Sequence, residues 1–300
     1  MNRIALQNWA RALRAYSFTA TIIPVVCAFL FARATGAAVD WRLFPLMLFC
    51  ALLLHAGVNL LNDYYDFTLG FDTPEARGSS GLLTGKKVAP VYMLVWGRFY
   101  VFGGIFTGLI LAALRGWPLL AAGIAGAAGA WFYSNRIGYK YKGLGEPFVF
   151  ILMGPLLFDG AFYAATGTVT ANAAWPALSC GCMVTAILLV NNLRDLKMDA
   201  AAGFTTLPMR LGPVRTKKLY AALIALAYAA LLAPVASGTV HAGLLLPVLS
   251  LPFAWRQVRS ILATVTLNSD LAAAPPQTAK LYLIFGLLLA AGLLFGIASV

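Results

Sequence analysis

One stretch of the sequence, residues 55–72, concentrates groups that bind cations. It reads HAGVNLLNDYYDFTLGFD and contains three aspartates, Asp63, Asp66 and Asp72. The stretch begins inside an apolar run at 43–61, which is about long enough to cross a bilayer as a helix. Carboxylates near hydrocarbon are costly unless a partner compensates their charge. A divalent cation is such a partner, and ligands that are all oxygen atoms favour Mg²⁺.

The spacing within this stretch is helical. With 3.6 residues per turn, His55, Asn59, Asn62 or Asp63, and Asp66 fall on one face of a helix. The alternative is a solvated loop beside the membrane, in which the carboxylates have no common ligand. For His55 the structural alternative, a neutral hydrogen-bonded residue of the helix, competes with a role in binding a substrate.

A second stretch, residues 191–199, repeats the pattern. It reads NNLRDLKMD and closes an apolar run at 176–190. Asn191, Asp195 and Asp199 stand at positions i, i+4 and i+8, which lie on one helical face. If both stretches end on the same side of a membrane, their acidic faces oppose each other. Such a pair of acidic helix ends suits a diphosphate held by Mg²⁺, because Mg²⁺ takes few carboxylates directly and binds substrate phosphates.

The composition indicates a polytopic membrane protein. The chain has 300 residues, of which 61% are hydrophobic and 11% charged, against about 25% charged residues in soluble domains. The apolar runs are continuous rather than alternating, which predicts helices and not a barrel. Nine runs approach the length of a span, and the first of them gives no convincing sign of a cleavable signal. They lie at 16–33, 43–61, 92–114, 117–134, 147–166, 175–193, 218–236, 240–262 and 278–298.

The net charge of +12 is explained by topology rather than by a nucleic-acid partner. With the N-terminus inside, nearly all 22 Lys and Arg fall in the N-terminal segment and the loops on that side. Only Arg33, Arg42 and Arg115 fall on the other side. This is the positive-inside bias, and it predicts that both acidic stretches face the cytoplasm. Part of the excess charge would also attract an anionic substrate.

At these residues the sequence resembles the UbiA superfamily of intramembrane prenyltransferases, and its menaquinone branch most closely. The resemblance rests on Asn62 to Asp66 with Asp72-Thr73, and on the Asn-Asn-x-Arg-Asp start of the second stretch with Asp199. Two further blocks are also similar. They are Tyr133 to Gly145 (YSNRIGYKYKGLG) and Arg14 to Thr19 with Pro24.

The resemblance implies a single all-α domain over residues 1–300. About nine transmembrane helices would surround a central cavity, with a cytoplasmic cap from the loops between spans 2 and 3 and between spans 6 and 7. The implied reaction is Mg²⁺-dependent transfer of a polyprenyl group from polyprenyl diphosphate to an aromatic acceptor. The menaquinone branch favours 1,4-dihydroxy-2-naphthoate as acceptor, which gives demethylmenaquinone after loss of the carboxylate. The implied location is the cytoplasmic membrane of a bacterium.

Site residues follow from the two acidic stretches, from their charge and from the resemblance. The predicted Mg²⁺ ligands are Asn62, Asp63, Asp66, Asp195 and Asp199. The predicted catalytic residues are Lys140, Arg136 and Asp72, with Lys140 matching the family's basic residue after a tyrosine. The predicted substrate-binding residues are Arg14, Arg77, Tyr133, Tyr139, Lys142, Arg194, Lys197, Asn59 and Asn191. Tyr133 and Tyr139 could stack against an allylic cation, and the basic side chains would stabilise a leaving diphosphate.

Several interpretations stay open at this point. Arg14 and the basic residues at 136–142 could be topological anchors instead of diphosphate contacts. The glycines of spans three and four could serve helix packing or leave room for a prenyl chain. Phe204 replaces a lysine that is usual in the family, which removes one cation from the mouth of the site. Asp159 is an intramembrane carboxylate that ranks below the others because relatives typically carry an apolar residue there.

Two rival functions remain. Within the family the acceptor could be 4-hydroxybenzoate, homogentisate, a tetrapyrrole precursor or a lipid. Outside it, paired acidic groups in spans also mark ion-coupled transporters. Transporters place such groups near the bilayer midplane, whereas here they cluster at span ends together with amides and cations. The prenyltransferase interpretation is therefore favoured.

Overall fold

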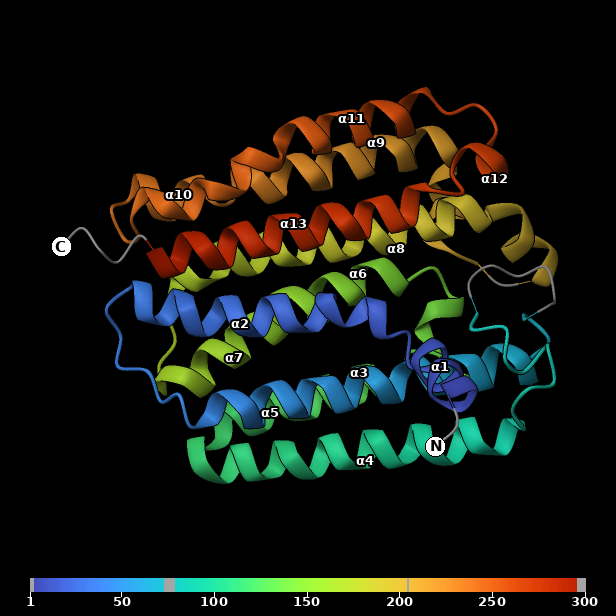
Figure 1. Cartoon of the computed structure of the whole chain (residues 1–300), viewed down its shortest axis with the longest axis horizontal. Helices are drawn as coiled ribbons and strands as arrows, with labels where there is room; N and C mark the ends of the chain where they lie inside the picture. The colour runs from blue at the N-terminus through green and yellow to red at the C-terminus, as the bar shows by residue number, and fades with distance from the viewer. Residues whose placement is uncertain (1–2, 73–78, 204, 296–300) are drawn as a thin grey trace.

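The structure is a computed structural model, and it describes residues 3–72, 79–203 and 205–295. Within these residues helices dominate, and the extended structure is limited to an isolated bridge between Lys142 and Thr205. Figure 1 shows the long helices lying side by side and running alternately in opposite directions. The all-helical prediction is confirmed.

The α-helices follow each other along the chain. The first six are α1 (Arg3–Ala12), α2 (Thr19–Ala34), α3 (Leu43–Thr68), α4 (Pro90–Arg115), α5 (Trp117–Trp131) and α6 (Gly145–Ile151). A π-helical turn, Leu152–Leu156, joins α6 to α7. The others are α7 (Leu157–Thr166), α8 (Ala174–Ala202), α9 (Leu207–Ala229), α10 (Leu232–Ala236), α11 (Leu251–Ala263), α12 (Leu267–Asp270) and α13 (Ala274–Phe295).

Seven helices in the described part of the chain are long and apolar enough to cross a membrane. The other two predicted spans correspond to shorter helical segments. One is α5, with 15 residues. The other is the 3₁₀ segment Ala242–Ser250 followed directly by α11. The polytopic membrane fold is thus confirmed. Of these two segments, α5 is a shorter helix than the apolar run suggests, and the other begins as a 3₁₀ helix.

The core lies where α2, α7, α8 and α13 meet. Phe29, Phe158, Met183 and Phe285 are fully buried there. On the other side of the molecule α3 packs against α4 through glycines. A Cβ atom at Gly57 would lie 2.6 Å from Val101 Cγ2, so these helices approach more closely than larger residues would permit.

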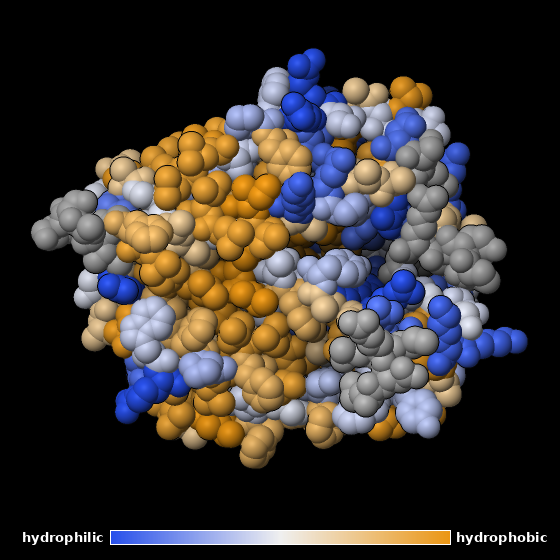
Figure 2. All heavy atoms as spheres, viewed as in Figure 1, coloured by the Kyte–Doolittle hydropathy of each residue, from blue (hydrophilic) through white to orange (hydrophobic). Residues whose placement is uncertain are grey.

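Polar and apolar residues separate along the long axis. Figure 2 shows hydrophobic residues across the middle of the molecule and hydrophilic residues gathered at the end where α3 and α8 finish. At the opposite end, Arg42 and Arg115 both pair with Asp40. Both acidic stretches therefore lie at one end of the bundle.

A loop covers part of that polar end. Leu82 and Leu83, in the connection between α3 and α4, are buried against Ala12, Leu60 and Met93. The described part of this loop thus packs down onto α1 and the end of α3. The predicted cap over the cavity mouth stays a prediction.

Candidate active site

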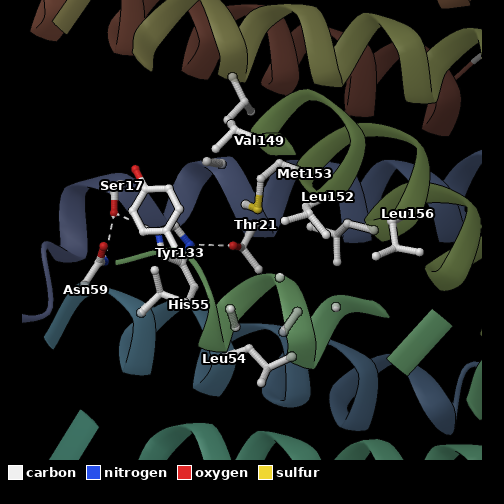
Figure 3. A pocket seen from close by; sticks show the side chains of 18 of the residues that line it. Ser17, Thr21, Leu54, His55, Asn59, Tyr133, Val149, Leu152, Met153 and Leu156 are labelled. Carbon is white, nitrogen blue, oxygen red and sulfur yellow. Dashed lines mark hydrogen bonds between the residues drawn. The ribbon is translucent and has the colours of Figure 1, made fainter. Parts of the chain in front are cut away.

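A cavity of about 330 Å³ opens between α2, α3, α5, α7 and α8. Figure 3 shows aliphatic side chains such as Leu152, Met153 and Leu156 along one part of its wall. Polar side chains gather at the end of the cavity nearest the acidic stretches. They are Arg14, Ser17, His55, Asn59, Asn62, Tyr133 and Asn191. The cavity can hold an apolar chain whose polar end points toward the two acidic stretches.

The first acidic stretch holds a lysine between two side chains of α3. Lys140 Nζ donates to Asn62 Oδ1 at 2.6 Å and to Asp66 Oδ2 at 2.6 Å. Asn62 Nδ2 also donates to Asp66 Oδ2 at 2.9 Å. Asn62 and Asp66 are one helical turn apart, so the two oxygen atoms face the same point. The predicted placement of Lys140 beside this stretch agrees with the structure.

Aromatic rings surround the lysine. Its ammonium lies 5.9 Å from the ring centroid of Tyr133 and 5.3 Å from that of Tyr141. Tyr139 packs edge-on against Tyr133 at 5.5 Å, and its hydroxyl donates to the Gly129 carbonyl. The ring faces of Tyr133 and Tyr141 thus lie near the ammonium, a geometry that stabilises positive charge.

Tyr141 is a site residue that the sequence analysis missed. Its hydroxyl lies 2.7 Å from Asp66 Oδ1 and 3.0 Å from the Ser134 carbonyl oxygen. Burial raises the pKa of this phenol well above its usual value, and Asp66 adds to the shift. Tyr141 therefore stays neutral and acts as a donor to the carboxylate. Its direct proximity to Lys140 in the sequence was the available signal.

Asp63 points away from that cluster, toward the N-terminal segment. Its Oδ1 accepts from Arg14 Nη2 at 2.6 Å, and its Oδ2 lies 3.3 Å from the backbone nitrogen of Ser80. The aspartate is almost fully buried. Both carboxylate oxygens of Asp63 thus have partners within the protein, and its predicted role as a metal ligand stays a prediction.

The second acidic stretch lies on the last turns of α8. Arg194 forms a bidentate ion pair with the neighbouring Asp195, with Nε 2.7 Å from Oδ1. The charges of Asp195, Lys140 and Asp66 all act on the Asp199 carboxylate. The two acidic stretches, far apart in sequence, therefore lie close enough for their charges to interact.

Asp72 lies at the edge of this group. Its backbone N–H donates to the carbonyl of Asp66 at 3.0 Å. Burial raises the pKa of Asp72 to about 6, and the carboxylates of Asp63 and Asp66 add to the shift. Asp72 is therefore protonated at a pH closer to neutral than a solvated aspartate is.

The oxygen set suits a magnesium ion that also binds substrate phosphates. Within the described residues no group of three or more His, Cys, Asp or Glu side chains is arranged to enclose a metal. A cationic ammonium nevertheless sits against Asn62 Oδ1 and Asp66 Oδ2, so these atoms already stabilise positive charge. Mg²⁺ typically uses one or two carboxylates and completes its shell with water and phosphate oxygens. The residues present fit that pattern.

Other predicted residues lie outside the cluster. Arg136, Lys142 and Lys197 are exposed, and in the described part of the chain no hydrogen bond or ion pair joins their side chains to the acidic groups. Lys142 contributes its backbone carbonyl, which accepts from Arg210 Nη2 at 2.6 Å. Arg77, together with Phe204, lies outside the described residues.

A buried carboxylate beside the second stretch was also missed. Glu146, at the start of α6, is 1% exposed. Its Oε1 accepts from Asn192 Nδ2 at 2.9 Å. The contact ties the beginning of α6 to the part of α8 that carries Asn191, which lines the cavity. A single glutamate after a glycine gave no sequence signal for this pairing.

Comparison with known proteins agrees with this fold and identifies the family. The model of the UbiA prenyltransferase family matches residues 21–264. The chain is 30% identical to UbiA prenyltransferase domain-containing protein 1 of Homo sapiens, over 97% of this chain and 85% of that protein. It is 35% identical to 1,4-dihydroxy-2-naphthoate octaprenyltransferase of Mycobacterium tuberculosis, over 73% of this chain and 75% of that one.

Solved structures share the fold. A UbiA homolog from Aeropyrum pernix superimposes with a TM-score of 0.71 at 17% identity, covering 92% of this chain and 98% of the other. A UbiA homolog from Archaeoglobus fulgidus bound to GPP and Mg²⁺ gives a TM-score of 0.64 at 14% identity, covering 95% and 99%. The protein is thus a multi-pass membrane enzyme of the prenyltransferase class. The chain belongs to the UbiA prenyltransferase family.

Proposed function

We propose that this enzyme transfers a polyprenyl group from polyprenyl diphosphate to 1,4-dihydroxy-2-naphthoate in a Mg²⁺-dependent reaction. The observation that carries the proposal is the position of the Lys140 ammonium. It lies between Asn62 and Asp66, within range of the Asp199 charge, at the polar end of an apolar cavity. A diphosphate needs positive charge at this point, and its hydrocarbon tail needs the cavity.

Asn62, Asp66, Asp195 and Asp199 would hold Mg²⁺, which neutralises the diphosphate and stabilises it as a leaving group. Asp63 would have a different role, since its contacts with Arg14 support anchoring of that guanidinium. Arg14 and Lys140 would contact the diphosphate oxygens from two sides. As the allylic carbon–oxygen bond breaks, its electron pair goes to the diphosphate, and Lys140 stabilises the developing charge.

The aromatic rings and the apolar wall would protect the electrophilic carbon. Tyr133 lines the cavity beside Lys140, so its ring face is available to positive charge on the allylic carbon. The aliphatic wall excludes water, which would otherwise capture that carbon. A ring carbon of the acceptor supplies the electron pair for the new carbon–carbon bond. The carboxylate at that carbon then leaves as carbon dioxide, and the electron pair of the broken carbon–carbon bond restores the aromatic ring.

The proposal also specifies the acceptor and the side of the membrane that the active site faces. Relatives in Mycobacterium tuberculosis and Bacillus subtilis that carry the name 1,4-dihydroxy-2-naphthoate octaprenyltransferase support this acceptor. The positive-inside distribution of Lys and Arg supports a bacterial cytoplasmic membrane with the active site facing the cytoplasm.

An assay with purified protein in lipid nanodiscs tests the proposal. Radiolabelled polyprenyl diphosphate would be offered with 1,4-dihydroxy-2-naphthoate, 4-hydroxybenzoate or homogentisate, each with Mg²⁺ or with EDTA. We expect a labelled prenylated product with the naphthoate, dependent on Mg²⁺. Product with another acceptor alone would replace the proposed substrate. No prenylated product with any acceptor, from protein that is shown to be folded, would contradict the reaction itself.

A further inference from the structure

The backbone at Arg14 has an unusual conformation. Its φ of 50° and ψ of 49° lie in the left-handed region, which residues with a Cβ atom rarely adopt. Arg14 connects α1 to the 3₁₀ turn Ala15–Phe18 that leads into α2. A conformation of this kind persists only where surrounding contacts hold it.

Three residues of α3, spaced one turn apart, supply those contacts. Asp63 binds the Arg14 guanidinium, and Asn59 Nδ2 donates to the Leu13 carbonyl at 2.8 Å. His55 Nε2 lies 3.1 Å from Ser17 Oγ. Positions 55, 59 and 63 share one face of α3. The three side chains contact the segment 13–17 from three successive turns of α3. Figure 3 shows His55 and Asn59 beside Ser17.

The hydrogen bonds of His55 have a defined direction. Ser17 Oγ donates its only proton to the Arg14 carbonyl at 2.8 Å, so it accepts from His55 Nε2–H. A neutral imidazole with a proton on Nε2 has a lone pair on Nδ1. That lone pair accepts from Thr21 Oγ1 at 2.6 Å. A continuous chain of donors therefore runs from Thr21 through His55 and Ser17 to the backbone of Arg14.

The side chain held by this arrangement has a buried donor that is still available. Arg14 Nη2 binds Asp63, whereas Arg14 Nε is buried and has no partner in the described part of the chain. Arg14 lines the cavity next to Asn59 and Asn62. Its Nε–H is therefore available to an anionic group at the polar end of the cavity.

We propose that His55 is a positioning residue for substrate binding. Through Ser17, and together with Asn59, it holds the left-handed backbone of Arg14 so that Arg14 Nε–H meets a diphosphate oxygen. This inference rests on the proposed function, because a diphosphate is the anion that the reaction brings to this end. His55 acts from the wall of the cavity and through another residue, not on the reacting atoms.

Binding of inorganic diphosphate in the presence of Mg²⁺, measured by calorimetry on purified protein, tests the inference. We expect His55→Leu and Ser17→Ala each to weaken binding by about tenfold. His55→Gln, which retains a donor and an acceptor, should restore most of the affinity. His241→Leu is the matched control, because the chain's other histidine accepts from the Gly243 backbone N–H at a distant 3₁₀ turn; it should leave diphosphate binding unchanged.

A double-mutant cycle separates positioning from a merely structural role. If His55 and Ser17 act through Arg14, then adding either substitution to Arg14→Ala should change diphosphate affinity by less than twofold. Thr21→Val removes only the hydrogen bond between Thr21 Oγ1 and His55 Nδ1. If His55→Leu does not fold, diphosphate affinity is measured in Thr21→Val instead. Normal diphosphate affinity in folded Ser17→Ala and Thr21→Val would overturn the inference. Absence of diphosphate binding by the unaltered protein would overturn the proposed function, and this inference with it.

Discussion

Lys140 Nζ lies 2.6 Å from Asp66 Oδ2 and at the same distance from Asn62 Oδ1. The ammonium thus binds the same oxygen atoms that we propose as Mg²⁺ ligands. Two cations cannot share these atoms at contact distance, because unit charges about 4 Å apart repel by about 4 kcal/mol at an effective dielectric constant near 20. Lys140 and the metal therefore compete until the diphosphate supplies the lysine with another partner.

Lys140→Gln should separate the two roles of this lysine. Turnover should fall by about a hundredfold to a thousandfold, because the leaving diphosphate loses a charged contact. Affinity for Mn²⁺, used as a spectroscopic substitute for Mg²⁺, should rise by about tenfold or more, because the competing ammonium is gone. Electron paramagnetic resonance titration measures the free Mn²⁺ directly.

Lys142→Gln provides the matched control for that experiment. It removes the same charge two residues away, from an exposed side chain. Mn²⁺ affinity should then change by less than about twofold, since exposed charges are screened. If Lys140→Gln weakens Mn²⁺ binding instead, the lysine supports the metal site rather than competing for it.

Replacing the aspartates tests the proposed metal ligands themselves. Asp66→Asn, Asp195→Asn and Asp199→Asn keep the side-chain size but remove one negative charge each. Each variant should lose about a hundredfold to a thousandfold in rate and should need more Mg²⁺ for half-maximal activity. Asp40→Asn, at the opposite end of the bundle, should behave like the unaltered protein. Normal rates at low Mg²⁺ in folded Asp66→Asn and Asp195→Asn would contradict a metal site between α3 and α8.

The sequence predicted the fold well because a span requires a continuous apolar run. It could not predict where a run departs from a regular helix. The π-helical turn Leu152–Leu156 contains Pro155, and the segment Ala242–Ser250 is 3₁₀ with Pro247 inside. Hydropathy counts residues and does not register the backbone hydrogen bonds that proline removes.

The site was predicted in composition and only partly in arrangement. Helical periodicity grouped His55, Asn59 and Asp66 on one face, with Asn62 and Asp63 as alternatives. The structure separates them into two sets. His55, Asn59 and Asp63 contact the segment 13–17, whereas Asn62 and Asp66 contact Lys140. A rotation of 100° per residue divides neighbours at 62 and 63, and only tertiary contacts decide which partner each meets.

The sequence also could not predict which basic residues contact the acidic stretches. Sequence alone placed several cations near the acidic stretches, yet Lys140 is bound between Asn62 and Asp66 whereas Arg136 is exposed. The conformation of the turn between α5 and α6 makes this difference. Its Tyr141 was missed because only the tertiary contact of its hydroxyl with Asp66 distinguishes it from the tyrosines at 133 and 139.

The raised pKa of Asp72 predicts a pH dependence of metal binding. Below pH 6 this carboxyl is mostly protonated and neutral, and above pH 6 it is ionised beside Asp66. Added negative charge favours a cation, so Mn²⁺ affinity should increase by about tenfold from pH 5 to pH 7. In Asp72→Asn the increase should be smaller. An unchanged pH dependence in that variant would assign the titration to another group.

Labelling of single cysteines tests the proposed orientation. The native cysteines Cys27, Cys50, Cys180 and Cys182 are buried, and a variant with all four replaced gives a clean background. Ile137→Cys should then react with an impermeant maleimide only from the cytoplasmic side, and Val169→Cys only from the outside. Both positions are exposed, at 62% and 80%. Reaction of Ile137→Cys from outside would reverse the orientation and place the active site away from the cytoplasm.

The glycines of α4 and α5 divide into two kinds, and each kind predicts a different effect of substitution. Gly104 belongs to the packing kind, because a Cβ atom there would lie 2.7 Å from Leu54 Cγ. Gly123 lines the cavity, and a Cβ atom there meets nothing within 4 Å. A larger side chain at Gly123 therefore occupies space that we propose for the prenyl chain.

Gly123→Leu should leave the melting temperature within a few degrees of the unaltered protein and raise KM for polyprenyl diphosphate by about tenfold or more. The physical reason is loss of cavity volume, so a short analogue such as dimethylallyl diphosphate should be affected less than a polyprenyl substrate. Gly104→Leu is the matched control: it should lower the melting temperature, because α3 and α4 must separate. Thermal unfolding in detergent and steady-state kinetics with both substrate lengths measure these effects. If Gly123→Leu accepts the long and the short substrate as the unaltered protein does, the prenyl chain does not lie against α5, and the proposed use of this cavity is wrong.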